Sequence, residues 1–119
     1  MIGIIAAAAA AAVSVGGIDC SGGFDRLMEA VTTTPGIVRD PSPRGFLVFV
    51  DAKALTIYTV TTPEQAAHPA LIRRQAVVSG SSTALQMSGC SFGDKAAFDT
   101  LINRFDELNS QAAREAGGR

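Results

Sequence analysis

Few residues in this chain have the side chains for catalysis, because it contains one histidine, His68, and two cysteines, Cys20 and Cys90. A cysteine nucleophile needs a free thiolate beside a base, and Cys90 with His68 is the candidate pair. The structural alternative for His68, which lies in residues 66–70 (AAHPA), is that its ring bonds a nearby backbone group. One histidine and two cysteines do not complete a zinc site within one chain. The sequence therefore predicts no metal and no cofactor.

A serine nucleophile needs a base and oxyanion donors held around it. Residues 88–91 (SGCS) are the nearest feature of that kind, and they are also typical of the end of a strand. Two acidic pairs are predicted to face solvent: Asp25 with Glu29, and Asp106 with Glu107. Acid and base catalysis by paired carboxyls would need them in a cleft. The sequence thus offers few of the groups that hydrolysis needs. A small hydrolase therefore ranks third among the function classes, after two kinds of binding protein.

Two adjacent arginines, Arg73 and Arg74, lie in a predicted strand, where successive side chains point to opposite faces. One interpretation is a frayed strand start, with both guanidinium groups extending to water. The other is that Arg74, with Arg39 or Arg44 from a proline-rich segment, binds a carboxylate or phosphate of a partner. With His68, these arginines are the candidate contacts for an anionic ligand or an envelope protein.

The charge balance excludes some partners. The chain has 10 lysines and arginines against 11 aspartates and glutamates, and neither sign forms a run. Nucleic acids and anionic membrane surfaces attract proteins through basic patches. We therefore expect no nucleic-acid partner, and the oligomeric state stays open.

The N-terminal segment predicts export. Residues 1–15 carry no charge and include seven consecutive alanines at 6–12, followed by two glycines ahead of the first cysteine. An apolar stretch followed by small residues is typical of a secretory signal. Such a signal normally opens with a basic residue, whereas the first one here is Arg26. A start codon further upstream would account for that difference.

Two alternatives to export remain for this segment: a retained membrane anchor and a buried N-terminal helix. About 15 helical residues reach about 22 Å, which is short of the roughly 30 Å hydrocarbon core, so no stable membrane anchor is expected. We predict a signal peptide over residues 1–17, with the cleavage site left open, and one small domain over residues 18–119. The expected location is the periplasm or the extracellular medium.

Two cysteines in an exported chain of this size most simply form one disulfide, Cys20 to Cys90. Closing a loop of about 70 residues stabilises the folded state by about 4 kcal/mol on the chain-entropy model. The alternative is two unrelated buried thiols.

Hydrophobic spacing predicts two helices. Residues 21–31 place apolar side chains at i, i+3, i+4 and i+7, with Ser21 as the cap. The last helix begins after Asp94, its cap, and ends near residues 117–118. Its wider apolar stripe is predicted to cover one face of a sheet.

Runs of β-branched and aromatic residues predict four strands in two hairpins. Residues 46–50 (FLVFV) are uninterrupted apolar residues and are predicted to form the most central strand. Thr62 followed by Pro63 predicts a short helix between the hairpins, and helix is the alternative for all of residues 64–78. The predicted strands are residues 46–50, 55–61, 71–78 and 83–88.

The predicted fold is therefore an α+β domain of two layers, in the order α-β-β-β-β-α. A four-stranded antiparallel sheet carries the C-terminal amphipathic helix on one face, beside a short N-terminal helix.

The first functional hypothesis is an exported, non-enzymatic binding protein. It would act through the edge strand, residues 83–88, by pairing with an extended partner, or through the proline-rich loop and the arginines. The alternative is an enzyme inhibitor or immunity-like protein that plugs a cleft with a rigid loop, residues 39–45.

Overall fold

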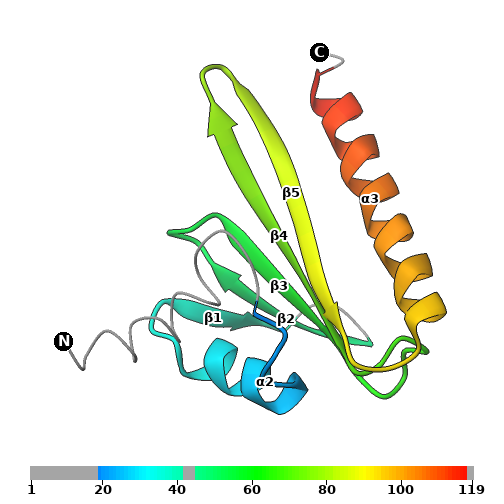
Figure 1. Ribbon diagram of the computed structural model, residues 1–119. Coiled ribbons are helices and arrows are strands. Elements are labelled where there is room, and N and C mark those ends of the chain that lie inside the picture. The colour runs from blue at the N-terminus through cyan, green and yellow to red at the C-terminus, as the bar shows by residue number, and fades with distance from the viewer. Residues whose placement is uncertain (1–18, 42–44, 118–119) are drawn as a thin grey trace.

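The computed structural model describes residues 19–41 and 45–117, with side chains up to Gln111. The predicted signal peptide, residues 1–17, lies outside the described residues. The fold is α+β, as predicted (Figure 1). Its elements are α2 (Phe24–Thr33), β1 (Ile37–Asp40), β2 (Phe46–Asp51), β3 (Thr56–Thr61), β4 (Ala70–Ser79), β5 (Ser82–Ser91) and α3 (Lys95–Gly117).

The sheet has five antiparallel strands in the order β1-β2-β3-β4-β5, so each strand pairs with its neighbours in sequence. The prediction of four strands was wrong. β1 was missed because it ends in Arg39 and Asp40 and is followed by Pro41, and these residues are typical of a loop. Ile37 nonetheless pairs with Asp51, which extends the sheet beyond β2. The most central strand is therefore β3 rather than β2.

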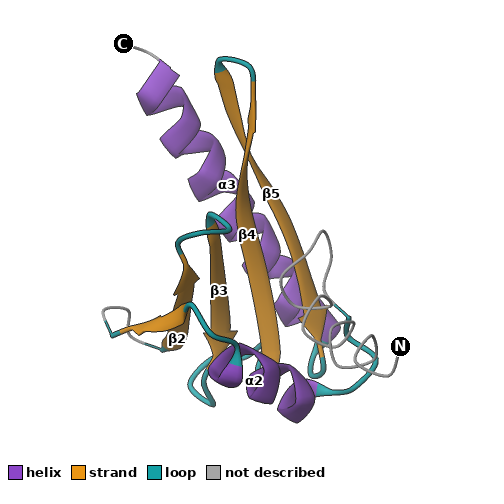
Figure 2. Cartoon of the chain, turned by 90° about the vertical axis from the view of Figure 1, so that its left-hand side faces the viewer, coloured by secondary structure: helices purple, strands orange, loops and turns teal. Residues whose placement is uncertain are grey.

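The two helices lie on opposite faces of the sheet (Figure 2). Leu27 and Val31 of α2 pack with Tyr58 and other side chains of one face, here called the α2 face. Phe98 and Leu101 of α3 pack with Ile72 on the other, the α3 face. Side chains alternate between the two faces along each strand, so each face has its own apolar cluster. The prediction of two layers was therefore wrong, and the domain has three layers: α2, the sheet and α3.

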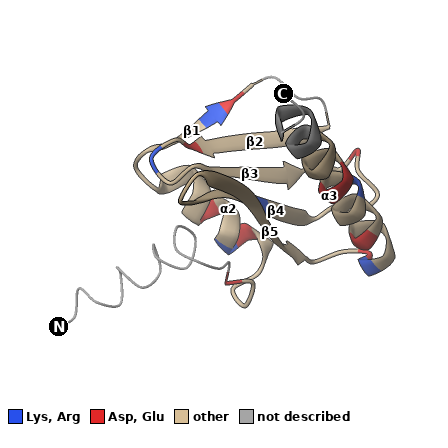
Figure 3. Cartoon of the chain, turned by 90° about the horizontal axis from the view of Figure 1, so that it is seen from above, with Lys and Arg blue, Asp and Glu red and all other residues tan. Residues whose placement is uncertain are grey.

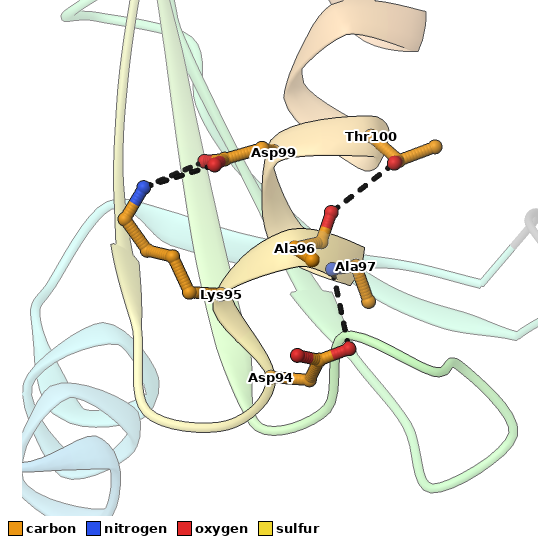
Figure 4. Close-up of polar contacts among 6 residues, drawn as sticks. All are labelled: Asp94, Lys95, Ala96, Ala97, Asp99 and Thr100. Atoms are coloured by element: carbon orange, nitrogen blue, oxygen red, sulfur yellow. Dashed lines mark hydrogen bonds and ion pairs between the residues drawn. The ribbon is translucent and has the colours of Figure 1, made fainter.

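The start of α3 was predicted correctly. The Asp94 carboxylate accepts a hydrogen bond from the backbone N–H of Ala97 at 3.3 Å (Figure 4), which satisfies one of the unpaired donors of the first turn. In that turn Lys95 and Asp99 form an exposed ion pair at 2.9 Å. Gly89 of β5 allows α3 to approach, since a Cβ there would lie 2.8 Å from the ring of Phe98.

Two other sequence expectations were wrong. Helix α2 begins after Gly23, which has no side-chain cap, and not after Ser21. Residues 62–69 form turns instead of a short helix. The Thr62 hydroxyl donates to the carbonyl of Gly45 at 2.9 Å, so it holds the loop against the sheet instead of capping a helix. Residues 70–79 are a strand, which excludes helix for that part of 64–78.

The β4–β5 hairpin extends beyond the rest of the sheet. β4 pairs with β3 over Leu71 to Gln75 only, whereas it pairs with β5 along its whole length to Ser79. The outer half of the hairpin is therefore two-stranded, and it projects away from β3 alongside α3 (Figure 1).

Candidate functional site

The predicted disulfide is present. Cys20, just before α2, is bonded to Cys90 near the end of β5, with their Cα atoms 5.6 Å apart. Cys90 lies in the core cluster that α2 covers, so the bridge holds the start of α2 against β5. The described chain has no free cysteine. A thiolate nucleophile paired with His68 is therefore not available in the oxidised protein.

His68 contacts the backbone of β3. Its Nδ1 lies 3.1 Å from the carbonyl oxygen of Thr61 and 3.0 Å from the Thr61 hydroxyl oxygen, an arrangement that needs the proton on Nδ1. The Phe24 ring and the imidazole pack in an edge-to-face arrangement, with 5.6 Å between ring centroids. The Thr61 hydroxyl already exchanges hydrogen bonds with the backbone of Ala70. These contacts connect α2, β3 and β4, which is a structural role.

Residues 89–93 (GCSFG) have the G-x-S-x-G spacing at a junction between strand and helix, a spacing that was not recognised when residues 88–91 were considered from the sequence alone. A nucleophile elbow presents its serine hydroxyl at an exposed, strained turn. Ser91 instead belongs to β5, its hydroxyl is buried without a hydrogen-bond partner, and Leu55 is the non-glycine residue with positive φ among those described. The geometry does not make Ser91 a nucleophile.

Two of the three candidate arginines, Arg39 and Arg74, are not brought together. Arg39 is exposed on β1 opposite Phe49, so it lies on the α2 face. Arg74 pairs with Ile57 and Met87 on the α3 face. Arg44 lies outside the described residues. Arg39 and Arg74 therefore cannot grip one anion between them.

Arg74 packs between the hairpin and α3. Its guanidinium carbon lies 5.1 Å from the ring centre of Phe105, and Nη1 donates to the Asn109 side-chain oxygen at 3.4 Å. Burial lowers the pKa of Arg74 from its usual range. Asn109 also donates to the Met87 sulfur at 3.9 Å. These contacts fasten α3 to the hairpin, so they give Arg74 a positioning role within the fold.

One of the two interpretations had Arg73 extending to water, and the structure contradicts it, because Arg73 is 2% exposed. The reason is that β4 begins at Ala70, so Arg73 is inside a regular strand between Tyr58 and Ser88. Its Nη2 donates to the Gln75 side-chain oxygen at 2.8 Å, while its Nε is buried and unbonded.

One edge of β5 has no neighbouring strand among the described residues. Two backbone hydrogen bonds of 2.9 Å show which residues point their N–H and C=O groups toward which neighbour. The N–H of Phe92 donates to the carbonyl of Pro69, on the β4 side of β5, and the N–H of Ala76 in β4 donates to the carbonyl of Leu55, on the β3 side. Hydrogen-bonded and non-hydrogen-bonded pairs alternate in an antiparallel ladder. With the observed β4–β5 register, every second residue of β5 turns its N–H and C=O away from β4. The outward set in the outer half comprises Thr83, Leu85 and Met87.

This edge carries no charge. Residues 75–93 contain no aspartate, glutamate, lysine or arginine, and among the described residues β5 pairs with β4 alone. The opposite edge differs, because β1 has four residues and includes Arg39 and Asp40. Figure 3 shows the contrast between coloured charges on β1 and a tan β5. Edge strands are normally protected by charges, prolines or bulges, and β5 has none of these.

A shallow hollow of about 250 Å³ lies between residues 65–67 and the first half of α3. Arg104 is the one charged side chain that lines it, beside Gln65 and Thr100. A general acid and base would need a second titratable group there. The hollow therefore lacks the composition of an active site.

Within residues 19–41 and 45–117, no group of histidine, cysteine and acidic side chains is arranged to hold a metal ion. In the same ranges, no helix combines the length and apolar character needed to cross a membrane. Comparison of the chain with protein families, curated proteins and solved structures finds no match. Its function has to be inferred from its own residues.

Proposed function

We propose that this chain is an exported, non-enzymatic binding protein that accepts an extended segment of a partner protein at the free edge of β5. The observation that carries the proposal is the ten-residue, uncharged edge strand at the end of the sheet. Main-chain hydrogen bonds to an added strand give affinity, and the flanking side chains give specificity.

The exposure of the outer half of β5 supports this proposal. Residues 82–86 are exposed, and Leu85 keeps 47% of its surface in contact with solvent. An added strand would satisfy the outward N–H and C=O groups of Thr83, Leu85 and Met87 and would cover the Leu85 side chain. Both changes favour binding, since they pair polar groups and remove apolar surface from water.

The disposition of the nucleophilic side chains supports a non-enzymatic role. Cys20 and Cys90 are bonded to each other, and the His68 ring bonds to Thr61. The disulfide supports export, because such bonds persist in oxidising compartments. An anion contact at Arg74 stays a prediction, and unchanged partner affinity in Arg74→Ala would contradict it. The loop of the inhibitor alternative includes residues 42–44, which lie outside the described residues.

The experiment that tests this proposal is site-specific photo-crosslinking in the envelope of the native host. A photoreactive side chain at Gln86, exposed on β5, is compared with one at Val38, which is 66% exposed on the opposite edge. We expect Gln86 to capture one partner and Val38 to capture none. The partner should become protected from hydrogen exchange in the segment that is crosslinked.

A proline variant tests whether backbone pairing is responsible. Leu85→Pro removes an outward N–H and leaves the β4–β5 ladder intact, because proline is tolerated where the N–H faces solvent. Leu85→Val keeps the N–H and serves as the matched control. We expect the proline variant to lose capture at least tenfold while the valine variant retains it. Equal capture by both variants would overturn strand addition at β5.

A further inference from the structure

Strand addition at β5 sets conditions on the strand that binds. The side chains of Thr83, Leu85 and Met87 lie on the α3 face, because Met87 pairs with Arg74 and Leu85 with Ala76. Those of Ala84 and Gln86 lie on the α2 face. Directly opposed side chains stabilise a sheet when apolar residues meet apolar or β-branched ones, whereas like charges oppose pairing. A fitting strand is therefore uncharged, with apolar or β-branched residues at every second position.

β5 itself meets these conditions. We propose that the strand added to β5 is β5 of a second copy, in an antiparallel dimer whose two-fold axis passes beside Leu85. This inference rests on the proposed function, since it names the partner for the same edge. Leu85 of each copy then exchanges N–H···O=C bonds with its counterpart. Thr83 of one copy faces Met87 of the other, and Ala84 faces Gln86.

The paired strands bring no charges together. A two-fold axis brings identical segments together, so any charge in the paired strand would lie near its own like charge. Residues 75–93 carry none. The two Leu85 side chains, each 47% exposed in the single chain, meet on the α3 face and shield one another from water. Burial of apolar surface adds to the main-chain hydrogen bonds.

The geometry closes at two copies. Antiparallel pairing of β5 with β5 uses the same surface on both molecules, which makes the interface isologous. The outer edges of the resulting sheet are then the two β1 strands, each four residues long with Arg39 and Asp40 exposed or half-buried. Short, charged edges resist further pairing. The structure therefore points to a dimer and not to a filament.

The test is a charge exchange on the axis. Protein with its disulfide intact is examined by sedimentation equilibrium from micromolar to millimolar concentration, as wild type, Leu85→Lys and Leu85→Glu. We expect the wild type to have twice the mass of one of its own chains, and each variant to fall to half the wild-type value because like charges meet across the axis. An equimolar mixture of the two variants should regain the dimer mass. The control variant Val38→Lys, which changes the opposite edge of the sheet, should remain a dimer like the wild type.

The outcomes separate this inference from the proposal on which it rests. A wild type that stays monomeric at all concentrations overturns self-pairing, and so does a Leu85→Lys variant that remains dimeric. If the wild type is monomeric, strand addition at β5 still stands when the probe at Gln86 crosslinks a different protein and Leu85→Pro abolishes that crosslink. If the chain is monomeric and that capture is also absent, both proposals are wrong.

Discussion

At the scale of single residues, the pKa of the Tyr58 hydroxyl reports on burial at the α2 face. It is the one tyrosine of the chain and is 1% exposed. Burial raises the pKa of its hydroxyl above the usual value of about 10, and a hydrogen bond from Arg73 and the charge of Arg73 oppose that rise. The nearby charge of Asp51 adds to it. Burial is the largest of these effects, so the neutral phenol is favoured in the folded state.

The first prediction concerns this titration. Below about pH 10 the phenol is protonated in both the folded and the unfolded chain. Between that value and the higher folded pKa the unfolded chain releases its proton first, so the free energy of unfolding falls as pH rises through this window. Ultraviolet absorbance of tyrosinate should show a midpoint above that of the chain in denaturant. Tyr58→Phe should flatten the dependence of stability on pH in the same window, and equal midpoints would contradict the prediction.

Leu55 provides a second prediction at this scale. It connects β2 to β3 with a φ of 54°, a left-handed conformation that costs about 1 kcal/mol or more for a side chain other than glycine. Its side chain is 53% exposed, so little packing would be lost on removing it. Leu55→Gly removes this strain, and the greater freedom of glycine in the unfolded chain offsets part of the gain. The free energy of unfolding in urea should therefore rise by less than about 1 kcal/mol.

The neighbouring Ala54 supplies the control, because it is not among the residues with positive φ. Ala54→Gly should lower stability by about 0.5 to 1 kcal/mol through the greater freedom of the unfolded chain. If both substitutions destabilise by similar amounts, the backbone at Leu55 stores no strain.

At the scale of elements, the disulfide compensates for the short length of α2. This ten-residue helix has no side-chain cap at Gly23, and isolated helices of that length are marginal in water. The bond between Cys20 and Cys90 spans 70 residues of sequence. It limits the freedom of the unfolded chain and also brings the start of α2 to the end of β5.

The third prediction is that reduction of this bond lowers the free energy of unfolding by about 4 kcal/mol. Comparing oxidised and reduced wild-type protein in urea measures the effect without replacing Cys90, which is buried. The double variant Cys20→Ser, Cys90→Ser should be at least as unstable as the reduced chain, because it also places a hydroxyl in the core. A loss below about 1 kcal/mol would mean that the loop is already constrained in the unfolded state.

Local sequence signals predicted most elements, and they failed where distant contacts decide the structure. Asp94 and the stripe that includes Phe98 identified α3, and the bounds of β3 agree within one residue. β1 was missed because Arg39 and Asp40 form a strand only by pairing with Phe49 and Val48.

The candidate site followed the same pattern. The sequence correctly placed β5 at an edge of the sheet, because the last strand before a covering helix has no later strand to pair with. It could not show that Arg39 and Arg74 face opposite sides, since that depends on the register between β1 and β2. The outward direction of the β5 backbone groups also depends on register, which the alternation of polar and apolar residues in β5 is too weak to fix.

At the scale of the whole molecule, the uncharged edge strand β5 and the disulfide place different requirements on the cell. An unprotected edge strand favours aggregation during folding, and a bond between Cys20 and Cys90 needs an oxidising compartment. Export in an unfolded form satisfies both, because the edge would form only after translocation, where the disulfide can form with it. The apolar residues 1–15 are the segment that would direct this export.

The fourth prediction follows from that argument. Protein recovered from the envelope and medium of its host should begin between about residues 11 and 20, after a cut that follows small residues. Its intact mass without reductant should be lower by two hydrogens than the reduced sequence from that start. Ala8→Arg places a charge in the apolar stretch, which a secretory signal does not tolerate, and should leave an uncleaved chain in the cytoplasm with both thiols reactive to alkylation. The matched substitution Ala84→Arg, in the exposed half of β5, should leave cleavage unchanged. A wild-type chain that is full-length, reduced and cytoplasmic would contradict export and, with it, the compartment in which we place the β5 partner.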